Sequence, residues 1–209
     1  MRYAIVQSGE SRSFPVNDPF LDRAGSAADV VVYLGAPLIL DDSKAAILVE
    51  LGTECLGFHT GQAAGEEGSN VLGFARYRNG SDPPSPLVEL VRQPNTRSEA
   101  LAAARVVFEA AGLTVVVCAD QAGRIIDRLV RPKYNAALRL LDEGLASAKD
   151  MDTTCRLGLG YRDGPIERVE RGGLAYHHDV TRALFEVYGT PAYAPARRAV
   201  VAKQREGKA

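Results

Sequence analysis

The chain has 209 residues, of which 46% are hydrophobic and 24% are charged, and its net charge is −1. This length allows one large domain or two small ones, and the balanced charge excludes the concentrated basic surface expected of a nucleic-acid-binding protein. No apolar run approaches the ~20 residues of a membrane-spanning helix. The first ten residues also lack the basic start and apolar core of a signal peptide.

The cysteines indicate a reducing environment. Cys55, Cys118 and Cys155 are widely spaced, odd in number and without a C-x-x-C motif. This pattern fits neither a disulfide framework nor a zinc site. We therefore expect a cytoplasmic protein without a bound metal.

The N-terminal segment begins like a nucleotide-binding unit and then departs from it. Residues 2–7 form a short β-branched and aromatic run, which predicts a first strand. In a Rossmann unit this strand leads into G-x-G-x-x-G, whose glycines let a pyrophosphate approach the backbone. The following segment, SGESRSFPVNDP, has only Gly9 as a glycine, and Pro15 and Pro19 interrupt any helix. The sequence thus predicts that the dinucleotide cradle is missing.

Further apolar runs predict a sheet. Strands are expected at residues 29–34, 71–78, 87–92 and 113–119, the last of them buried. Residues 44–51 could form a strand or a buried helix, because periodicity does not separate the two.

Glycines and a capping-box pattern predict a loop and a helix between these runs. Residues 52–70 hold Gly52, Gly57, Gly61, Gly65 and Gly68. They should be loop with at most one helical turn. Thr96 and Glu99 have capping-box spacing ahead of an alanine-rich helix that Gly112 closes. Strands alternating with a capped helix suggest an α/β layer with a partly parallel sheet.

From Gly123 onward the signals are helical. Four apolar residues recur at helical spacing: Val130, Tyr134, Leu138 and Leu141. Seven further positions indicate where helices begin, bend or end. Pro132 should lie in a first turn or mark a bend, Gly144 should end this helix, and Ser147 should cap a second one. Gly158 and Gly160 should end the second helix, and Gly164-Pro165 should start a third.

This helical segment resembles a known family. The run NAALRLLDEGLASAKDMD followed by LGLGYRDGP is similar to the C-terminal domain of the NAD-dependent 3-hydroxyacyl-CoA dehydrogenases, whose pattern is about N-E-A-x-x-L-x-x-x-G-x-A-S-x-x-D-I-D and then G-x-G-Y-P-x-G-P. The segments GFARYRN, PLVELV, PNTRSEALAAARVVFEAAG, LTVVVCAD and AGRIIDRL follow the family order as well. The resemblance therefore runs from about Val71 to the end of the chain.

The resemblance implies an architecture. We expect an α/β N-terminal, reduced Rossmann-like domain over residues 1–122, followed over residues 123–209 by an all-α helical domain like that of 6-phosphogluconate dehydrogenase. A similar unit forms the second half of longer bacterial 3-hydroxybutyryl-CoA and 3-hydroxyacyl-CoA dehydrogenases, in which the first half carries NAD binding and catalysis. By resemblance, the helical domain forms a homodimer and one wall of an acyl-CoA site, with helices 129–143 and 174–188 as candidate interface surfaces.

The family's catalytic residues are largely replaced. Its catalytic histidine, which takes the proton from the 3-hydroxyl group, falls at Ala75, and alanine has no titratable group. Its histidine-orienting glutamate corresponds to Glu89, and the asparagine of its G-F-I-x-N-R motif becomes Asp127, which loses the amide donor. Glu89 and Asp127 are thus remnant catalytic positions. The structural alternatives are a solvated strand-edge charge for Glu89 and a helix cap for Asp127.

Other candidates for chemistry carry structural alternatives too. His59, in a glycine-rich loop, could be a relocated base, but an imidazole bonded to the backbone is favoured. His178 falls on the apolar stripe of helix 174–188, as a core or interface residue. No histidine, cysteine or carboxylate spacing indicates a metal site. The basic tail at 197–208 is interpreted as a solvated helix face or a frayed end rather than a binding patch.

Two functions follow from the resemblance. The missing glycine motif and Ala75 favour a non-catalytic module that binds acyl-CoA or drives assembly in fatty or aromatic acyl-CoA degradation. The alternative is NAD-dependent oxidation of a 3-hydroxyacyl-CoA to the 3-oxo form, alone or completed by a catalytic partner subunit. NAD is implied by the family only, so no cofactor-binding residue is assigned.

Overall fold

The structure, a computed structural model, describes residues 1–26, 28–63 and 69–208. It contains two compact units. The first comprises Met1–Arg78 and Pro83–Arg124, and the second comprises Asn79–Asp82 and Ile125–Ala209. Within the described ranges, no helix has both the length and the apolar character needed to cross a membrane.

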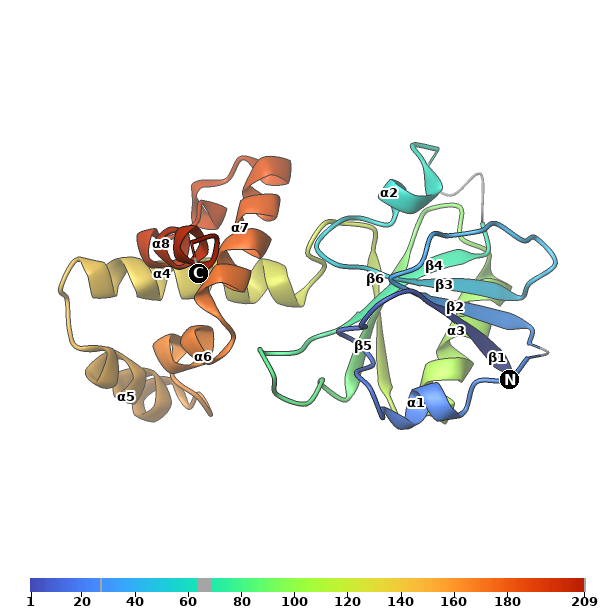
Figure 1. Ribbon diagram of the computed structural model, residues 1–209, viewed down its shortest axis with the longest axis horizontal. Coiled ribbons are helices and arrows are strands. Elements are labelled where there is room, and N and C mark those ends of the chain that lie inside the picture. The colour runs from blue at the N-terminus through green and yellow to red at the C-terminus, as the bar shows by residue number, and fades with distance from the viewer. Residues whose placement is uncertain (27, 64–68, 209) are drawn as a thin grey trace. The chain divides into compact units, whose positions relative to one another are not determined.

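The first unit is built on a six-stranded sheet (Figure 1), with strand order β1-β2-β3-β4-β5-β6. The strands are β1 (Tyr3–Gln7), β2 (Val30–Leu34), β3 (Ala46–Glu50), β4 (Val71–Arg76), β5 (Leu87–Arg92) and β6 (Thr114–Ala119). All neighbouring strands are parallel except β4 and β5, which are antiparallel. The expected α/β layer with a partly parallel sheet is confirmed, and the ambiguous run 44–51 contains strand β3.

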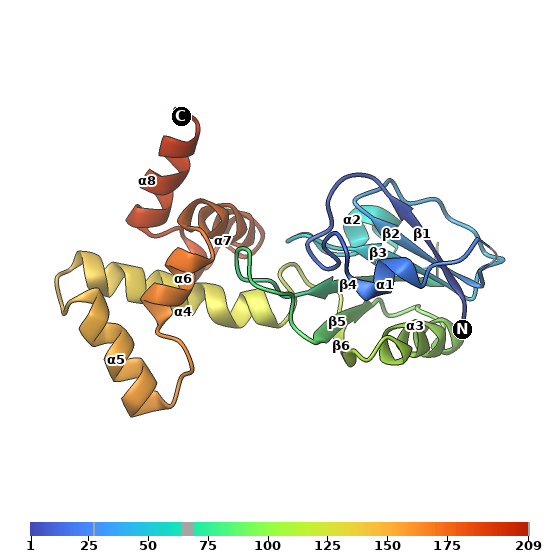
Figure 2. The same ribbon diagram turned by 60° about the horizontal axis from the view of Figure 1, so that its bottom comes forward.

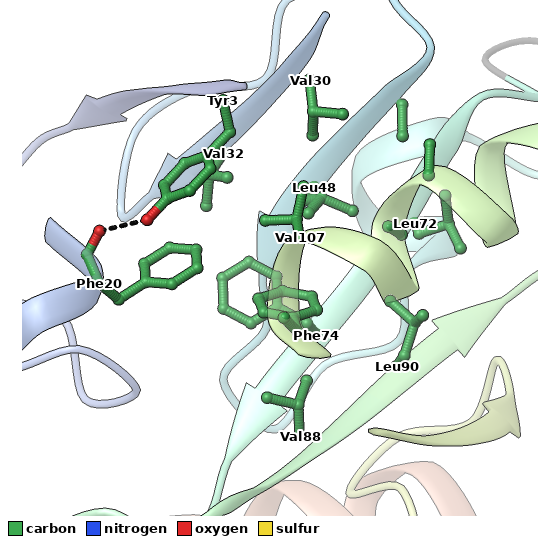
Figure 3. Close-up of a cluster of buried hydrophobic side chains, with 14 of the residues drawn as sticks. Tyr3, Phe20, Val30, Val32, Leu48, Leu72, Phe74, Val88, Leu90 and Val107 are labelled. Atoms are coloured by element: carbon green, nitrogen blue, oxygen red, sulfur yellow. Dashed lines mark hydrogen bonds between the residues drawn. The ribbon is translucent and has the colours of Figure 1, made fainter. Parts of the chain in front are cut away.

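One face of the sheet carries the larger apolar core. Helices α1 (Pro19–Asp22) and α3 (Ser98–Ala110) supply Phe20, Val107 and Phe108 to it. Figure 3 shows the strand side chains of this core, with the Tyr3 hydroxyl donating to the Phe20 carbonyl. Period-two alternation explains the arrangement, because every second strand residue points to this face.

The opposite face carries a smaller core. Ile47, Val49, Val71 and Val91 point to it. The loop residues that pack on it are Ala36, Leu38 and Leu56. Helix α2 (Gly57–Thr60) is a single turn, as the glycine-rich composition predicted; Gly65 and Gly68 lie outside the described residues.

Two predictions for the first unit are wrong in detail. The Thr96 hydroxyl accepts from the Gln93 N–H instead of capping α3, whose N-cap is Arg97. The tight turn after β5 thus uses the hydroxyl that the capping-box pattern had assigned to the helix. Strand β6 is half-buried rather than buried, because it pairs only with β5 and forms an edge of the sheet.

All secondary-structure elements in the described residues of the second unit are helices (Figure 2). Its elements are α4 (Ile126–Asp142), α5 (Ala148–Leu159), α6 (Pro165–Arg171), α7 (Leu174–Tyr188), the 3-10 turn η1 (Pro191–Tyr193) and α8 (Arg197–Glu206). Helix α4 packs against α6, α7 and η1. The predicted apolar face of α4 is confirmed, since Tyr134 and Leu138 are buried in the core and Val130 and Leu141 pack against it.

Most of the predicted starts and ends of these helices are confirmed. Gly144 has φ +73° after α4, and the Ser147 hydroxyl accepts from the Asp150 N–H at 3.1 Å. Gly160, in the left-handed conformation, ends α5. Gly158, which was also expected to end α5, lies inside it. Pro132 lies inside α4 rather than in the first turn, which leaves the expected bend as a prediction. The helix tolerates it there within a packed unit, although a donor is lost.

Gly164 is the N-cap of α6, and a contact with a residue of the preceding helix explains why glycine is needed there. The buried Asp152 carboxylate accepts from the N–H groups of Ile166 and Glu167 at 2.8 and 3.0 Å. A Cβ on Gly164 would lie 2.2 Å from the Asp152 Cβ. The glycine therefore allows the carboxylate to reach the first turn of α6, where it satisfies donors that the helix cannot.

Candidate functional site

The two positions that the resemblance gives to the catalytic histidine and its glutamate are cross-strand neighbours. Ala75 on β4 lies directly opposite Glu89 on β5. Both residues are buried, at 7% and 4% exposure. Opposite residues in an antiparallel pair have Cβ atoms about 5 Å apart. A side chain at position 75 could therefore contact Glu89, but the methyl group of Ala75 offers no proton acceptor.

Glu89 has an arginine neighbour instead. Its Oε2 lies 3.7 Å from Nε of Arg124, and the two side chains are 5% and 4% exposed. The Nη2 group of Arg124 donates to the Gly52 carbonyl at 2.6 Å. The expectation of a solvated strand-edge charge for Glu89 is thus wrong. The reason is that Arg124, itself buried, lies beside it as a counter-charge.

The arginine of this ion pair does not supply a general base. An arginine guanidinium keeps its proton at all ordinary pH values, so it cannot take a proton from a hydroxyl group. Two nitrogens of Arg124, Nε and Nη1, are buried without a hydrogen-bond partner in the part of the chain that the structure describes. The close carboxylate of Glu89 therefore provides the compensating charge for a buried cation.

Cys118 does not replace the missing base either. It lies on β6 opposite Val91. Burial first, and then the negative charge of Glu89, raise the pKa of its thiol to about 11. The side chain is consequently a neutral thiol at physiological pH rather than a reactive thiolate.

Asp127 lies in the second unit, in the first turn of α4. Its Oδ1 accepts from Nε of Arg131 at 2.8 Å, and both side chains are nearly buried. The expectation of a helix cap is therefore wrong, because the N-cap is Ile125 and the carboxylate is held by an arginine one turn along the same helix. Its charge is compensated within α4.

The same arginine extends the network to α7. Nη1 of Arg131 lies 3.3 Å from Nδ1 of His177, and Nε2 of His177 lies 3.0 Å from the Asn135 side-chain oxygen. An arginine only donates, so Nδ1 accepts and Nε2 carries the proton that Asn135 accepts. Burial, and then the positive charge of Arg131, lower the pKa of His177 to about 3. His177 is accordingly neutral.

The histidine expected in the core was assigned to the wrong position. His178 is only half-buried and lies 3.1 Å from Asp179, whereas its neighbour His177 is fully buried. The buried face of α7 also contains Thr181, which packs one turn after His177. Because this buried face contains polar residues, the spacing of apolar residues did not show which side of α7 is buried.

His59 lies on α2 beside a cavity of about 510 Å³ at the carboxyl ends of the parallel strands. Its Nε2 is 3.4 Å from Glu54 Oε1, and its polar contact is with this carboxylate rather than with Glu89 or the backbone. Glu10 and Glu50 also line the cavity, together with Arg12. Of its four ionised residues, three are carboxylates, so the lining is predominantly acidic.

The chain itself fills the carboxyl edge beside this cavity. After β1, the Ser11 hydroxyl and the Ser13 N–H donate to the Glu50 carboxylate at 2.9 and 2.8 Å. From the end of β4, Arg76 donates to the Ser13 carbonyl and pairs with Asp18 at 2.8 Å. We call residues 11–18 the β1 strap. It occupies the segment in which a dinucleotide cradle would follow the first strand.

These features do not fit a bound dinucleotide. The strand order never reverses, so the described sheet has no switch-point crevice. The β1 strap is bonded to the sheet edge, and the adjoining cavity has an acidic lining that repels a pyrophosphate. Among the described residues, no group of three or more histidine, cysteine or acidic side chains is arranged to hold a metal ion.

Sequence reasoning missed Arg124. The signal was present, because Arg124 stands where the family motif G-F-I-x-N-R has its phenylalanine. A charged residue at an aromatic position next to Gly123 predicts either exposure or a buried partner. Only the fold brings Glu89 close enough to be that partner.

Comparisons with known proteins support the resemblance. Residues 123–209 match the family model described as 3-hydroxyacyl-CoA dehydrogenase, C-terminal domain. The chain is 33% identical over 129 residues to the mitochondrial hydroxyacyl-coenzyme A dehydrogenase of Sus scrofa, which covers 58% of this chain and 40% of that protein. It is also 33% identical over 135 residues to a 3-hydroxybutyryl-CoA dehydrogenase of Mycobacterium tuberculosis, covering 64% of this chain and 46% of that protein.

A solved structure shares the fold. The (S)-3-hydroxybutyryl-CoA dehydrogenase PaaH1 from Ralstonia eutropha superposes with a TM-score of 0.72 at 20% identity, over 85% of this chain and 66% of that one. The chain spans less than half of the length of the two curated relatives named above. Residues 123–209 therefore match the 3-hydroxyacyl-CoA dehydrogenase C-terminal domain, and the chain is similar to dehydrogenases of that family.

Proposed function

We propose that the chain is a non-catalytic, acyl-CoA-binding or assembly module of acyl-CoA degradation, in short a pseudoenzyme. The observation that carries the proposal is the site at β4 and β5. Glu89 faces Ala75 across the sheet and pairs with Arg124, so the site holds a fixed ion pair where the family has an acid–base pair. Oxidation of a 3-hydroxyl group needs a base within hydrogen-bond reach.

The lack of a dinucleotide site supports the same proposal. The β1 strap and the acidic cavity do not fit NAD, which the family uses. Hydride transfer therefore has no acceptor in this chain. The proposed acyl-CoA ligand comes from the names of the relatives, which act on hydroxyacyl-CoA or 3-hydroxybutyryl-CoA.

The rest of the architecture belongs to this proposal. We place the domain boundary between residues 122 and 123, where the matched family domain begins. We take the second domain to be similar to the helical domain of 6-phosphogluconate dehydrogenase and to form a homodimer. A cytoplasmic location, with Cys55, Cys118 and Cys155 as free thiols, is part of the same proposal.

A spectrophotometric assay tests the proposal. Purified protein with acetoacetyl-CoA and NADH should consume no NADH above the background rate. Turnover above background that is lost in the Glu89→Gln variant, and kept in a matched Glu109→Gln variant on the surface of α3, would overturn the proposal. It would favour the alternative of an active dehydrogenase.

The alternative of completion by a partner has its own test. Because the chain spans less than half of its relatives, a second subunit could supply NAD binding and the base. A mixture with such a subunit should then oxidise 3-hydroxybutyryl-CoA faster than that subunit alone. Equal rates would leave the present chain without a catalytic role.

A further inference from the structure

A groove lined by arginines lies between the start of α7 and the outer face of α8. It encloses about 500 Å³, which is within the usual range for small-molecule sites. The groove is lined by six residues: Leu174, Arg197, Arg198, Val201, Ala202 and Arg205. It belongs entirely to the second unit.

Helical spacing explains how these residues meet. Arg197, Val201 and Arg205 are four residues apart in sequence, so they lie along one face of α8. The only buried residue of this helix is Ala199, and α8 packs on α7. The basic tail is therefore an ordered helix with one packed face, and the expectation of a frayed end is wrong.

The charges of this face are only partly compensated. Nε of Arg198 lies 2.7 Å from the Asp142 carboxylate, and Nζ of Lys203 lies 2.6 Å from that of Asp179. Within residues 1–26, 28–63 and 69–208, neither Arg197 nor Arg205 has an ion pair or a side-chain hydrogen bond. The groove thus presents two uncompensated positive charges about 12 Å apart along the helix axis.

The floor between these charges is apolar. Leu174 and Val201 line it together with Ala202. The aliphatic stems of the arginines extend the same surface, because such side chains bury their methylenes and keep the charged ends in water. A ligand that fits both features has at least two negative charges and an uncharged part.

We propose that this groove binds an organic polyphosphate that carries an uncharged arm. Arginine suits phosphate because its planar fork donates two parallel hydrogen bonds to the oxygens. Coenzyme A has this chemistry, and choosing it as the probe rests on the proposed function. The preference for phosphate follows from the groove alone, so adenosine 3′,5′-bisphosphate and pyrophosphate are independent probes.

Titration calorimetry with the full chain tests the inference. Coenzyme A should bind, and the Arg197→Gln/Arg205→Gln variant should bind it at least about tenfold more weakly, since two charge-assisted contacts are lost. The matched control is Arg182→Gln on α7, an exposed arginine paired with Glu186. This control should leave the affinity unchanged, and added salt should weaken binding to the unsubstituted chain.

The outcomes separate this inference from the proposed function. If coenzyme A binds equally well to the unsubstituted chain and the double variant, the groove is not its site, while acyl-CoA binding stands. If adenosine 3′,5′-bisphosphate binds in an arginine-dependent way but acetoacetyl-CoA does not, the groove stands and the proposed function fails. If none of the phosphate probes binds, the groove inference is overturned.

Discussion

The behaviour of Glu89 depends on one neighbouring residue. A carboxylate at 4% exposure would be strongly unfavourable without a counter-charge, and Arg124 is that counter-charge. The resemblance placed Glu89 at the glutamate position of the family motif. It could not show whether the side chain meets water, a histidine or an arginine, since Arg124 is 35 residues away in the chain.

The Glu89→Gln substitution should therefore destabilise the protein. It leaves Arg124 buried without its counter-charge, and breaking a buried pair in this way lowers the free energy of unfolding by about 3–5 kcal/mol. Urea denaturation gives this value. Glu109→Gln, which removes an exposed pair with Arg105, should lower it by less than about 1 kcal/mol.

A double-mutant cycle with Arg124→Met sharpens this prediction. The loss in the double variant should be smaller than the sum of the two single losses, because the variant buries no lone charge. Additive losses would show that Glu89 and Arg124 do not stabilise each other.

His177 gives stability a pH dependence. Its pKa is lowered to about 3 in the folded chain, from an ordinary value near 6.5. Between these two pKa values the unfolded chain therefore binds one more proton than the folded chain. The free energy of unfolding consequently falls as the pH drops below 6.5, by up to about 1.4 kcal/mol per pH unit.

The measurement is the free energy of unfolding between pH 7 and pH 5. In the His177→Gln variant, the slope of this free energy against pH should be smaller by an amount that corresponds to about one proton. The His178→Gln variant keeps the buried His177, so it should retain the part of the slope that His177 causes. Equal slopes for the unsubstituted chain and His177→Gln would contradict the buried, neutral imidazole.

At the scale of elements, the β1 strap shows what local pattern cannot predict. Gly9 and Pro15 indicated correctly that no helix follows β1 at once, whereas Pro19, which was expected to interrupt a helix, is the first residue of α1. They gave no sign that Phe14 enters the core, where its ring stacks on Phe20 with centroids 4.0 Å apart. That contact depends on hydrogen bonds to Glu50, which is distant in sequence.

Phe14→Ala should lower the free energy of unfolding by about 3–5 kcal/mol, because the side chain is fully buried among aromatic rings. Val16→Ala, at 74% exposure in the same strap, is the matched control and should change it by less than about 0.5 kcal/mol. Thermal or urea unfolding measures both. A small effect of Phe14→Ala would mean that the strap is not part of the core.

The helices of the second unit were predictable for the opposite reason. Ser147 and Gly144 act within a few residues of themselves, so their effects are visible in the sequence. The register of α7 was not, because its buried face mixes His177 and Thr181 with apolar residues. Hydrogen bonds of His177 with Asn135 and Arg131 make that polar face compatible with burial, and α4 supplies both partners.

At the scale of the whole molecule, exposed leucines indicate where a second copy would bind. Leu157 and Leu159 on α5 are 84% and 64% exposed, and Leu129 on α4 is 70% exposed. Large exposed apolar side chains of this kind are candidates for an association surface. This pattern fits the proposed homodimer, with α5 added to the helices expected from the sequence.

Light scattering coupled to size exclusion checks this prediction. The unsubstituted chain should elute as a dimer, and Leu157→Glu/Leu159→Glu should convert it to a folded monomer, since charges are poorly tolerated in an interface core. Val16→Glu in the first unit is the control and should remain dimeric. A monomeric unsubstituted chain would contradict the proposed assembly.

The central claim is that the chain binds acyl-CoA and lacks its own NAD site. Parallel melting curves with acetoacetyl-CoA and with NAD test it most directly, because a ligand at ~100 times its dissociation constant adds about 2.7 kcal/mol to the stability of the folded state. We expect the midpoint to rise with acetoacetyl-CoA and to stay unchanged with NAD. A rise with NAD alone would contradict the claim.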